Sequence, residues 1–201
     1  DFIFNYFRDS LAGVTFEVYA GEDIVSPDGL ETVLYQKDEL VSTIVTNDKG
    51  IAMIENLPLG EYYLVETKTL DGFVLDSEPI KAELFYIDQE TPVVHAGMSI
   101  TNERQKVEIT VVKKDAETEA FLEGAVLGLY AKNDIVNRKG DVLIAADTLV
   151  ERAVTDKDGT LKFVSDLPLG QYYVKEVEAP KGYVKSEDVY EIDGTSTDSS
   201  V

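Results

Sequence analysis

The stretch Leu57-Pro-Leu-Gly-Glu-Tyr-Tyr-Leu-Val-Glu66 decides the fold, because it returns almost unchanged as Leu167-Pro-Leu-Gly-Gln-Tyr-Tyr-Val-Lys-Glu176. In both versions a Pro and a Gly, which favour turns, precede a run that contains the aromatic and β-branched residues preferred in strands. The spacing between Leu57 and Leu167 suits a whole domain and is too long for one unit of a solenoid. The chain is therefore predicted to hold two copies of one domain.

Further matches extend the repeat in both directions from this stretch. Three more pairs keep nearly the same offset: Leu11-Ala-Gly-Val-Thr-Phe-Glu-Val-Tyr-Ala20 with Leu122-Glu-Gly-Ala-Val-Leu-Gly-Leu-Tyr-Ala131, Val45-Thr-Asn-Asp-Lys-Gly50 with Val154-Thr-Asp-Lys-Asp-Gly159, and Gly72-Phe73 with Gly182-Tyr183. Only short insertions separate the copies. We expect a first domain over residues 1–104 and a second over residues 105–201, joined at the polar residues 102–106.

Each copy is predicted to consist of β-strands. Apolar residues occupy every second position in two runs, at Val14, Phe16 and Val18 and at Val107, Ile109 and Val111. This period of two is typical of half-buried strands, so the predicted fold class is all-β, with two tandem antiparallel β-sandwich domains of the immunoglobulin-like kind and about seven strands each. The first domain is expected to be truncated at its N-terminus, where residues 2–7 read as a strand, and the second to lack its last strand. The sequence is therefore predicted to be part of a longer protein.

Composition excludes several classes of function. The 201 residues carry 39 acidic and 18 basic side chains, and the net charge of −21 disfavours nucleic acid and anionic membrane surfaces as partners. There is no cysteine, which excludes disulfides, thiolate zinc sites and a cysteine nucleophile. No run approaches the roughly 18 apolar residues of a membrane span. Neither insertion into a membrane nor a metal or cofactor is predicted for this segment.

Three ionisable residues continue apolar faces of the predicted strands. Glu66 shares a face with Tyr62 and Leu64, and Glu176 occupies the same place in the second copy. Lys113 follows the inward positions of the strand that begins at Val107. A buried carboxyl or amine is costly unless it is neutral or paired, and desolvation turns a lysine into a usable nucleophile. The alternative is that both acids face solvent and that Lys113 extends out to water.

Other residues with chemical potential have simpler interpretations. His95 is the only histidine, and Asp156-Lys-Asp-Gly159 lacks the further ligands of a calcium loop. The tyrosine pairs, at Tyr62-Tyr63 and Tyr172-Tyr173, could stack on a sugar, but core and cross-strand packing is the more common use of aromatic residues on strands. The sequence shows no active site for turnover, so we predict that the protein is not an enzyme.

Five ordered motifs together resemble a known family. They are Lys113-x-Asp115, Leu122-x-Gly-Ala125, Thr155-Asp-Lys-Asp-Gly159, Leu167-Pro-Leu-Gly-x-Tyr172 and Glu176-x-x-Ala-Pro-x-Gly-Tyr183. This set is similar to the collagen-adhesin B-type domains, also called SpaA-like or prealbumin-like, of Gram-positive pilins and surface adhesins. The resemblance implies a bond between a Lys on the first strand and the side-chain amide of an Asn on the last. A Glu assists, ammonia leaves, and an intramolecular isopeptide bond remains.

The resemblance implies roles for four residues. Lys113 would be the nucleophile and Glu176 the proton shuttle of the second domain, while Glu66 would be the shuttle and Asn102 the amide acceptor of the first. Lys113 and Asn102 belong to different domains and are not expected to pair with each other. The repeat offset puts Phe2 where the first domain should carry its Lys, and the acceptor of the second domain would fall beyond the end of the sequence. No complete set is therefore predicted within these residues.

The resemblance also implies a function and a location. The chain would be a structural stalk segment of an extracellular, cell-wall-anchored adhesin or pilin of a Gram-positive bacterium, in contact with neighbouring domains of the same protein. One alternative is a module that binds a host ligand such as collagen or a glycan through its longest loops, residues 24–37 and 133–146. A further alternative is an accessory module beside a catalytic domain.

Overall fold

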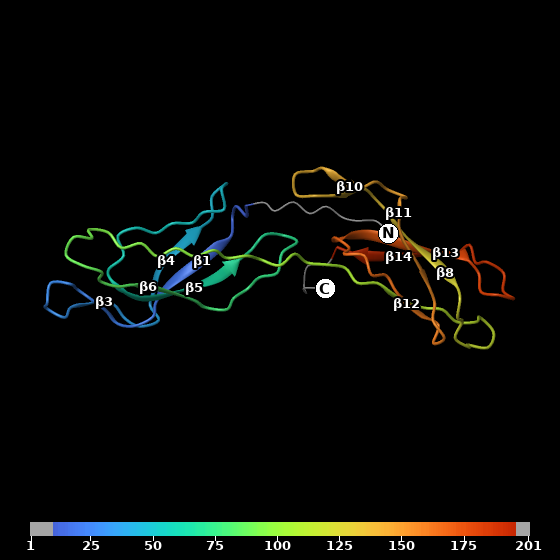
Figure 1. The fold of residues 1–201 in the computed structure, drawn as a ribbon, viewed down its shortest axis with the longest axis horizontal. Coiled ribbons are helices and arrows are strands. Elements are labelled where there is room, and N and C mark those ends of the chain that lie inside the picture. Colours follow the sequence, from blue (N-terminus) through green and yellow to red (C-terminus); the bar gives the residue numbers. More distant parts are fainter. Residues whose placement is uncertain (1–9, 196–201) are drawn as a thin grey trace. The chain divides into compact units, whose positions relative to one another are not determined.

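The computed structural model describes residues 10–195, which fall into two compact units, residues 10–104 and residues 105–195. Both units are built from strands and loops (Figure 1). The predicted strand at residues 2–7 and the predicted truncation after residue 195 lie outside the described residues.

The first unit is organised around one antiparallel sheet. Its four strands follow the order β4-β1-β5-β6, with the bounds Leu40–Val45, Thr15–Ala20, Gly60–Lys68 and Ile80–Leu84. The long strand β5 therefore lies inside the sheet, paired with β1 on one side and β6 on the other. A short hairpin of β2 (Ile24–Val25) and β3 (Val33–Tyr35) follows β1.

The second unit repeats this sheet and adds a second one. The order β11-β8-β13-β14 matches that of the first unit, with the bounds Leu149–Val154, Val126–Ala131, Gly170–Glu178 and Val189–Gly194. A short hairpin again follows the first strand of the sheet, formed by β9 (Ile135–Val136) and β10 (Val142–Ile144). The additional sheet pairs β7 (Thr110–Val112) with β12 (Thr160–Lys162). Within residues 10–104 no sheet corresponds to this pair.

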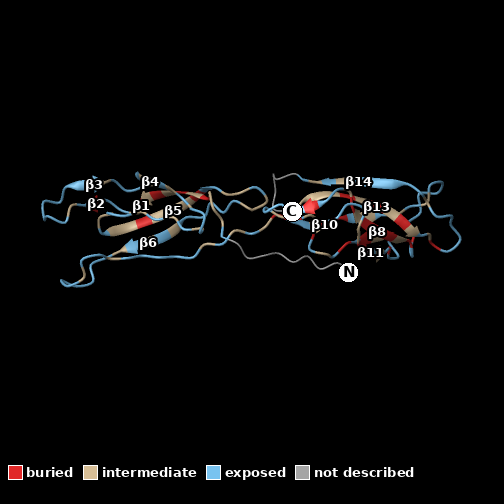
Figure 2. Ribbon diagram, turned by 90° about the horizontal axis from the view of Figure 1, so that it is seen from above, coloured by how far each residue is buried: buried red, intermediate tan, exposed pale blue. Residues whose placement is uncertain are grey.

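The core of the second unit lies between its two sheets. Leu127, Leu129 and Val174 from the four-stranded sheet pack in one cluster with Leu161 of β12 and Ile109, the residue before β7. In the first unit the buried cluster is smaller and consists of Val18, Ala20, Ile24 and Tyr62. Figure 2 shows buried residues on β1 and β5 in one unit and on β8, β11 and β13 in the other. The all-β fold with tandem sandwich domains is thus confirmed.

Two features of the strand pattern differ from the expectation of about seven strands per copy. The described residues contain six strands in the first unit and eight in the second, because β7 and β12 have no described counterparts in the first. In addition, the segments 24–37 and 133–146, expected to be loops, contain the hairpins β2-β3 and β9-β10. Paired strands satisfy backbone groups that an irregular loop would leave to water.

In both copies of the repeated motif the first tyrosine makes a hydrogen bond to the backbone carbonyl of the proline. The hydroxyl of Tyr62 donates to the carbonyl of Pro58 at 2.7 Å, and the hydroxyl of Tyr172 donates to the carbonyl of Pro168 at 2.6 Å. Both rings are buried, so each hydroxyl needs a partner within the fold. The bond fixes the entry into β5 and β13, the strands that carry Glu66 and Glu176.

Candidate functional site

Glu176 lies in the interior of the second unit. It sits on the central strand β13 opposite Leu127 of β8, and the residue is 5% exposed. The backbone N–H of Ser186 donates to its Oε2 at 2.6 Å. One carboxylate oxygen is therefore held by the chain segment that leads from β13 to β14, and the other is left for a second partner.

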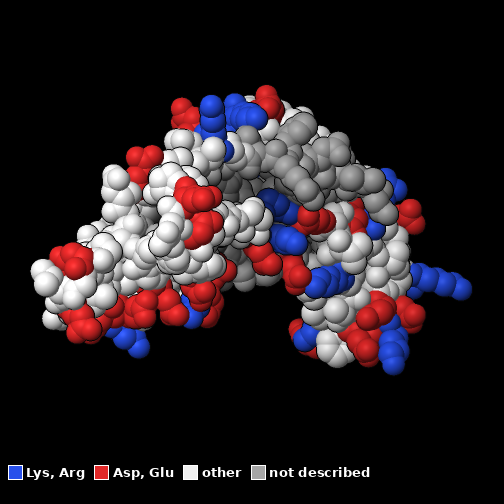
Figure 3. All heavy atoms as spheres, turned by 60° about the vertical axis from the view of Figure 1, so that its left-hand side comes forward, with Lys and Arg blue, Asp and Glu red and all other residues white. Residues whose placement is uncertain are grey.

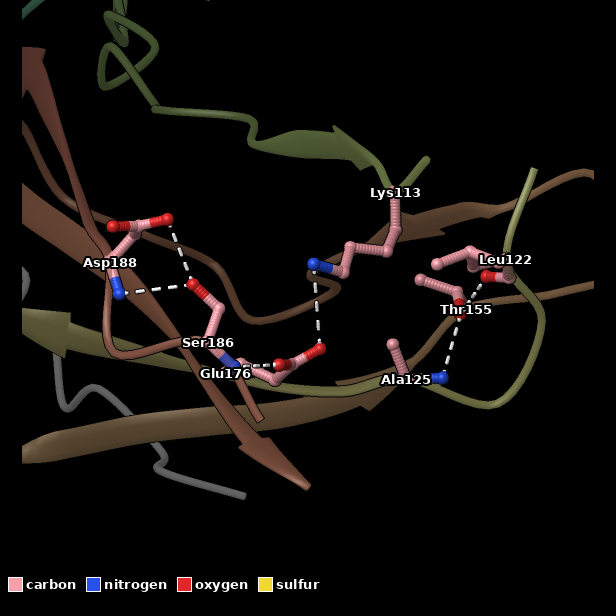
Figure 4. A network of polar contacts seen from close by, with 7 residues as sticks. All are labelled: Lys113, Leu122, Ala125, Thr155, Glu176, Ser186 and Asp188. Atoms are coloured by element: carbon pink, nitrogen blue, oxygen red, sulfur yellow. Dashed lines mark hydrogen bonds and ion pairs between the residues drawn. The ribbon is translucent and has the colours of Figure 1, made fainter. Parts of the chain in front are cut away.

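That second partner is Lys113. Its Nζ lies 3.6 Å from Oε1 of Glu176, and the two side chains are 24% and 3% exposed. Figure 4 shows the lysine reaching from the end of β7 toward the carboxylate. The backbone of Lys113 is fixed on both sides, because its N–H donates to Gly159 O at 2.7 Å and its carbonyl accepts from Leu122 N at 3.0 Å. The inward direction predicted from the alternation of β7 is thus confirmed.

The side chain of Thr155 holds the segment that leads into β8, next to Lys113, through two hydrogen bonds. The hydroxyl of Thr155 donates to Leu122 O at 2.6 Å and accepts from Ala125 N at 3.0 Å (Figure 4). Thr46 makes the same two bonds in the first unit, to Leu11 O and from Val14 N. Both threonines belong to the repeated Val-Thr motif, but the sequence did not predict that their hydroxyls would bond to the backbone.

Glu66 is the counterpart of Glu176 in the first unit and is only 1% exposed. The Nδ2 of Asn102 donates to its Oε1 at 2.7 Å and also to Val74 O at 3.1 Å. The N–H of Asp76, which aligns with Ser186, approaches the same Oε1 at 3.5 Å. Within the described part of the chain, Oε2 of Glu66 has no hydrogen-bond partner.

The structure therefore brings the four predicted residues together as two different pairs. The second unit holds an amine beside the buried acid, and the first unit holds a carboxamide nitrogen beside it. Because both acids occupy equivalent places on β5 and β13, each unit displays the part of a Lys, Glu and Asn set that the other lacks among residues 10–195. A carboxyl group in this position can exchange a proton with an amine on one oxygen and with an amide nitrogen on the other.

Asp115 lies two residues after Lys113 in an exposed turn. Its Oδ1 accepts from Thr118 N at 2.7 Å and from Glu117 N at 2.8 Å. These backbone bonds, with smaller contributions from the hydroxyls of Thr118 and Tyr183, lower the pKa of Asp115 to about 2. The hydrogen bond to Asp115 in turn raises the pKa of Tyr183. The turn after β7 is therefore linked to the Gly182-Tyr183 motif that leads to Ser186.

Sequence reasoning missed a third buried acid. Glu151 on β11 is 5% exposed and accepts hydrogen bonds from the backbone N–H groups of Val164 and Ser165, at 2.9 to 3.1 Å. The aligned residue of the first unit is Ser42, so the repeat gave no signal. The backbone amides of Ser186 and Asp76 were also missed, because sequence patterns report side chains only.

The remaining candidates have structural roles or lie exposed. Asp156 accepts from the N–H groups of Asp158 and Thr160, both at 2.9 Å, and so shapes its own turn. Tyr63 and Tyr173 stack on the neighbouring strand's tyrosines, with ring centroids 5.2 and 5.0 Å apart, which confirms cross-strand packing. His95 is exposed. Among residues 10–195 no group of three or more acidic, His or Cys side chains is placed to hold a metal ion.

Acidic and basic side chains both lie on the face of the molecule drawn in Figure 3. On the face drawn in Figure 3, Lys and Arg side chains stand beside Asp and Glu and do not form one continuous basic surface. Exposed ion pairs such as Lys162–Glu108 at 2.8 Å and Lys132–Glu191 at 2.7 Å belong to this pattern. Within the described ranges no helix has the length and apolar character needed to cross a lipid bilayer.

The chain thus consists of two tandem sandwich domains. Each has a buried glutamate in contact with a lysine amine or an asparagine amide. The SpaA prealbumin-like fold domain matches the chain twice, over residues 7–99 and 107–200, and the chain belongs to this family. No curated protein matches it.

Three solved structures illustrate what the chain is similar to. The Bacillus anthracis TIE protein is 28% identical with a TM-score of 0.59, and the match covers 96% of this chain and 30% of that one. The shaft pilin SpaA from Lactobacillus rhamnosus GG is 21% identical with a TM-score of 0.33, covering 92% and 84%. The streptococcal ancillary pilin is 21% identical with a TM-score of 0.33, covering 90% and 53%. The chain thus spans less than a third of the TIE protein.

Proposed function

We propose that the chain is a stalk segment of a cell-wall-anchored pilin or surface adhesin, built from domains of the type that is closed by a Lys–Asn isopeptide bond. Membership of the SpaA prealbumin-like family supports a pilin or surface-protein stalk. Its partners would be neighbouring domains of the same extracellular protein. The domains act by holding their shape, and any bond that they form is made once, so no turnover is involved.

The observation that carries the chemical part is the pair of complementary half-sites. Lys113 Nζ lies 3.6 Å from Glu176, and the leaving-group nitrogen of Asn102 lies 2.7 Å from Glu66. Burying either glutamate would be costly without the amine or amide that it contacts. Placed in one domain, the two contacts would set an amine and a carboxamide on either side of a single carboxyl group.

The bond would form by aminolysis of the amide. Glu176 takes a proton from the Lys113 ammonium, and the neutral amine attacks the carboxamide carbon of an Asn on the last strand. The carboxyl group then gives this proton to the departing nitrogen and accepts the second proton that the attacking nitrogen loses, which passes on to solvent. A C–N bond to Lys forms, the C–NH₂ bond breaks and ammonia leaves. A link that closes a loop of about 100 residues adds on the order of 4.7 kcal/mol in the chain-entropy model.

An extended chain tests this chemistry. The chain is lengthened past Val201 so that an Asn follows Gly182 at the same spacing that separates Gly72 from Asn102. Intact-mass measurement should show a loss of about 17 Da, one ammonia, as expected for attack by a desolvated amine on an amide. Lys113→Ala and Glu176→Ala should abolish the loss, and Glu66→Ala should leave it in place. An unmodified mass in the extended chain without substitutions would contradict the proposal.

A binding assay separates the stalk from the alternative of a host-ligand module. The hairpins β2-β3 and β9-β10 occupy the segments that the alternative requires, and Leu30 at the tip of the first is 76% exposed. Immobilised collagen and a glycan array are probed with the chain and with a variant whose hairpin tips, residues 26–32 and 137–141, are shortened. A stalk binds neither. Saturable binding that the shortened variant loses would favour the alternative.

A further inference from the structure

The outer face of the sheet β11-β8-β13-β14 carries two cations on either side of a glycine. Gly128 of β8 is paired with Arg152 of β11 on one side and with Lys175 of β13 on the other. Leu127 and Leu129, the neighbours of Gly128, belong to the core, so this row of three residues faces outward. Two strand spacings, about 10 Å, separate the cations. Their long side chains can therefore reach one anion above the glycine.

Neither cation forms an ion pair within residues 10–195. The Nζ of Lys175 lies 4.5 Å from the ring centroid of Tyr130, and Arg152 is exposed. Glu191, an acid on the neighbouring strand β14, is already engaged, because it pairs with Lys132 at 2.7 Å. In a chain with a net charge of −21, two adjacent cations without an acid create a local positive potential that attracts an anion.

The first domain places a carboxylate of its own in the equivalent row. Glu17 is aligned with Gly128, and its cross-strand neighbours Thr43 and Val65 are uncharged. The hydroxyl of Tyr19 donates a hydrogen bond to the Glu17 carboxylate. The same row of the sheet thus holds an acid between neutral residues in the first domain and a glycine between two cations in the second.

Tyr130 is aligned with Tyr19 and keeps the hydroxyl without the acid. A Cβ added at Gly128 would lie 3.1 Å from the Tyr130 hydroxyl oxygen and 2.8 Å from its Cε2, so the ring lies against the glycine. Among the described residues this hydroxyl has no hydrogen-bond partner. A free hydroxyl donor therefore lies beside the two cations, where the first domain has a tyrosine bound to a carboxylate.

We infer that the outer face of the second domain binds a carboxylate side chain from another polypeptide at Gly128. The donors are the guanidinium of Arg152, the ammonium of Lys175 and the hydroxyl of Tyr130. A carboxylate accepts from all three, and an arginine can hold both of its oxygens. The ligand supplies from outside the group that Glu17 supplies in the first domain.

Exposed valines favour a polypeptide over a sugar as the source of the carboxylate. Val154 lies two residues after Arg152 on the same face, and Val189 is paired with Lys175. These valines are 58% and 53% exposed. A sugar ring would bring hydroxyls against them and leave those hydroxyls without hydrogen bonds. A glutamate flanked by apolar residues contacts the valines and the cations together.

A nuclear magnetic resonance titration of the full chain tests the site. The probes are the peptide acetyl-Val-Glu-Val-amide and its matched form acetyl-Val-Gln-Val-amide. The glutamate peptide should shift the amide resonances of Gly128, Arg152 and Lys175 saturably. The glutamine peptide should bind about tenfold more weakly, because it cannot form charge-assisted hydrogen bonds. Added salt should weaken only the glutamate peptide.

Variants of the chain assign the donors. Arg152→Gln and Lys175→Gln should each reduce the preference for the glutamate peptide over the glutamine peptide, and together they should remove it. Lys157→Gln, in an exposed turn of the same domain, is the matched control and should leave the preference unchanged. Gly128→Glu copies Glu17 of the first domain and should abolish binding, because the chain then supplies the carboxylate itself.

Four results decide the inference. Absence of saturable binding, equal binding of the two peptides, or a preference for a tetrasaccharide that contains glucuronic acid over the glutamate peptide overturns it. Self-association of the chain that Arg152→Gln abolishes supports it and identifies a second copy as the source of the carboxylate. The site is independent of the proposed function, because Gly128 and Glu176 face opposite sides of the sheet. Arg152→Gln should therefore leave the loss of ammonia in the extended chain unchanged.

Discussion

At the scale of single residues, Glu66 and Glu176 show how one strand position can hold the same side chain with different partners. Both are buried on the central strand of a sheet. Glu176 meets the ammonium of Lys113, whereas Glu66 meets the amide of Asn102. Since an ion pair compensates the cost of burying a charge and an amide does so only in part, the two acids should respond differently to neutralisation.

Glu176→Gln should lower the free energy of unfolding of the second domain by about 1 to 2 kcal/mol, because it leaves the Lys113 ammonium without its partner and Lys113 retains some contact with water. Glu66→Gln should cost the first domain less or stabilise it, because the amide keeps an acceptor for Asn102. Hydrogen exchange in increasing urea measures each domain separately. Equal losses in both domains would contradict the assigned partners.

Tyr62 gives a prediction for alkaline pH. Burial raises its pKa from 10.0 to about 12, and Tyr35 and Glu22 add to the shift. The folded state therefore keeps a proton that the unfolded state releases, so this stabilisation is complete below pH 10 and is lost as the pH rises toward 12. Tyr62→Phe should reduce this loss, while costing about 1 kcal/mol at neutral pH for the bond to Pro58.

Urea unfolding of the first domain between pH 8 and 11 measures the effect of Tyr62. The matched control is Tyr86→Phe in the same domain, because Tyr86 is 62% exposed and its replacement should not change the slope of first-domain stability against pH. If stability falls with pH equally steeply in Tyr62→Phe and in the unsubstituted chain, the Tyr62 hydroxyl is not the source of the pH dependence.

The sequence identified the site residues wherever the alternation of a strand is regular. Glu66, Glu176 and Lys113 each follow apolar positions by two, and all three point inward as that period predicts. Asn102 is different, because it lies in a segment without assigned strand structure. It was found through the family resemblance and not from periodicity.

At the scale of elements, Glu151 fastens one edge of the second domain. It joins β11 to the chain just beyond β12 through the N–H groups of Val164 and Ser165. Its inward direction was not predictable, because the register shifts between Leu149 and Glu151. Such a register shift changes the face of the sheet on which the following side chains lie, and it cannot be predicted from the hydrophobic pattern.

Glu151→Ala should destabilise the second domain by about 1 to 3 kcal/mol, because it removes the charged acceptor of the partly buried hydrogen bonds from Val164 and Ser165. Ser42→Ala, at the aligned place in the first domain, should change stability by no more than about 0.5 kcal/mol. Amide exchange of Val164 and Ser165 reports on the contact directly. Unchanged protection of these two amides in Glu151→Ala would show that the carboxylate does not hold the segment.

At the scale of the whole molecule, the two copies should differ in stability. Among residues 10–195, the second domain has a cluster of twelve buried residues between two sheets, and the first has a cluster of four. Hydrophobic stabilisation scales with the apolar area removed from water, so residues 10–104 should unfold first. Calorimetry should show two transitions, and hydrogen exchange should show stronger protection in residues 105–195.

Core substitutions assign the two transitions. Leu129→Ala should lower only the more stable one, by about 2 to 5 kcal/mol. Val18→Ala, at the aligned position of the first domain, should lower only the less stable one. A single transition shifted by both variants would contradict independent unfolding.

The tandem arrangement was the easiest feature to predict, because the return of the Leu-Pro-Leu-Gly-x-Tyr-Tyr motif fixes it before any strand is assigned. The unequal cores were not predictable in this way. Ala52 aligns with Leu161, and Ile54 aligns with Phe163, but the size of a side chain does not say whether a strand covers it. That information lies in tertiary pairing and not in local pattern.

The hydroxyl hydrogen bonds that hold these domains together also bear on the redox conditions under which the domains can fold. Tyr62, Tyr172, Thr46 and Thr155 tie the strands through hydroxyl groups, and the chain has no cysteine to oxidise. Folding therefore involves no thiol exchange and does not depend on redox potential. The fold can be completed equally well in a reducing cytosol and in an oxidising medium, and dithiothreitol should leave its melting temperature unchanged.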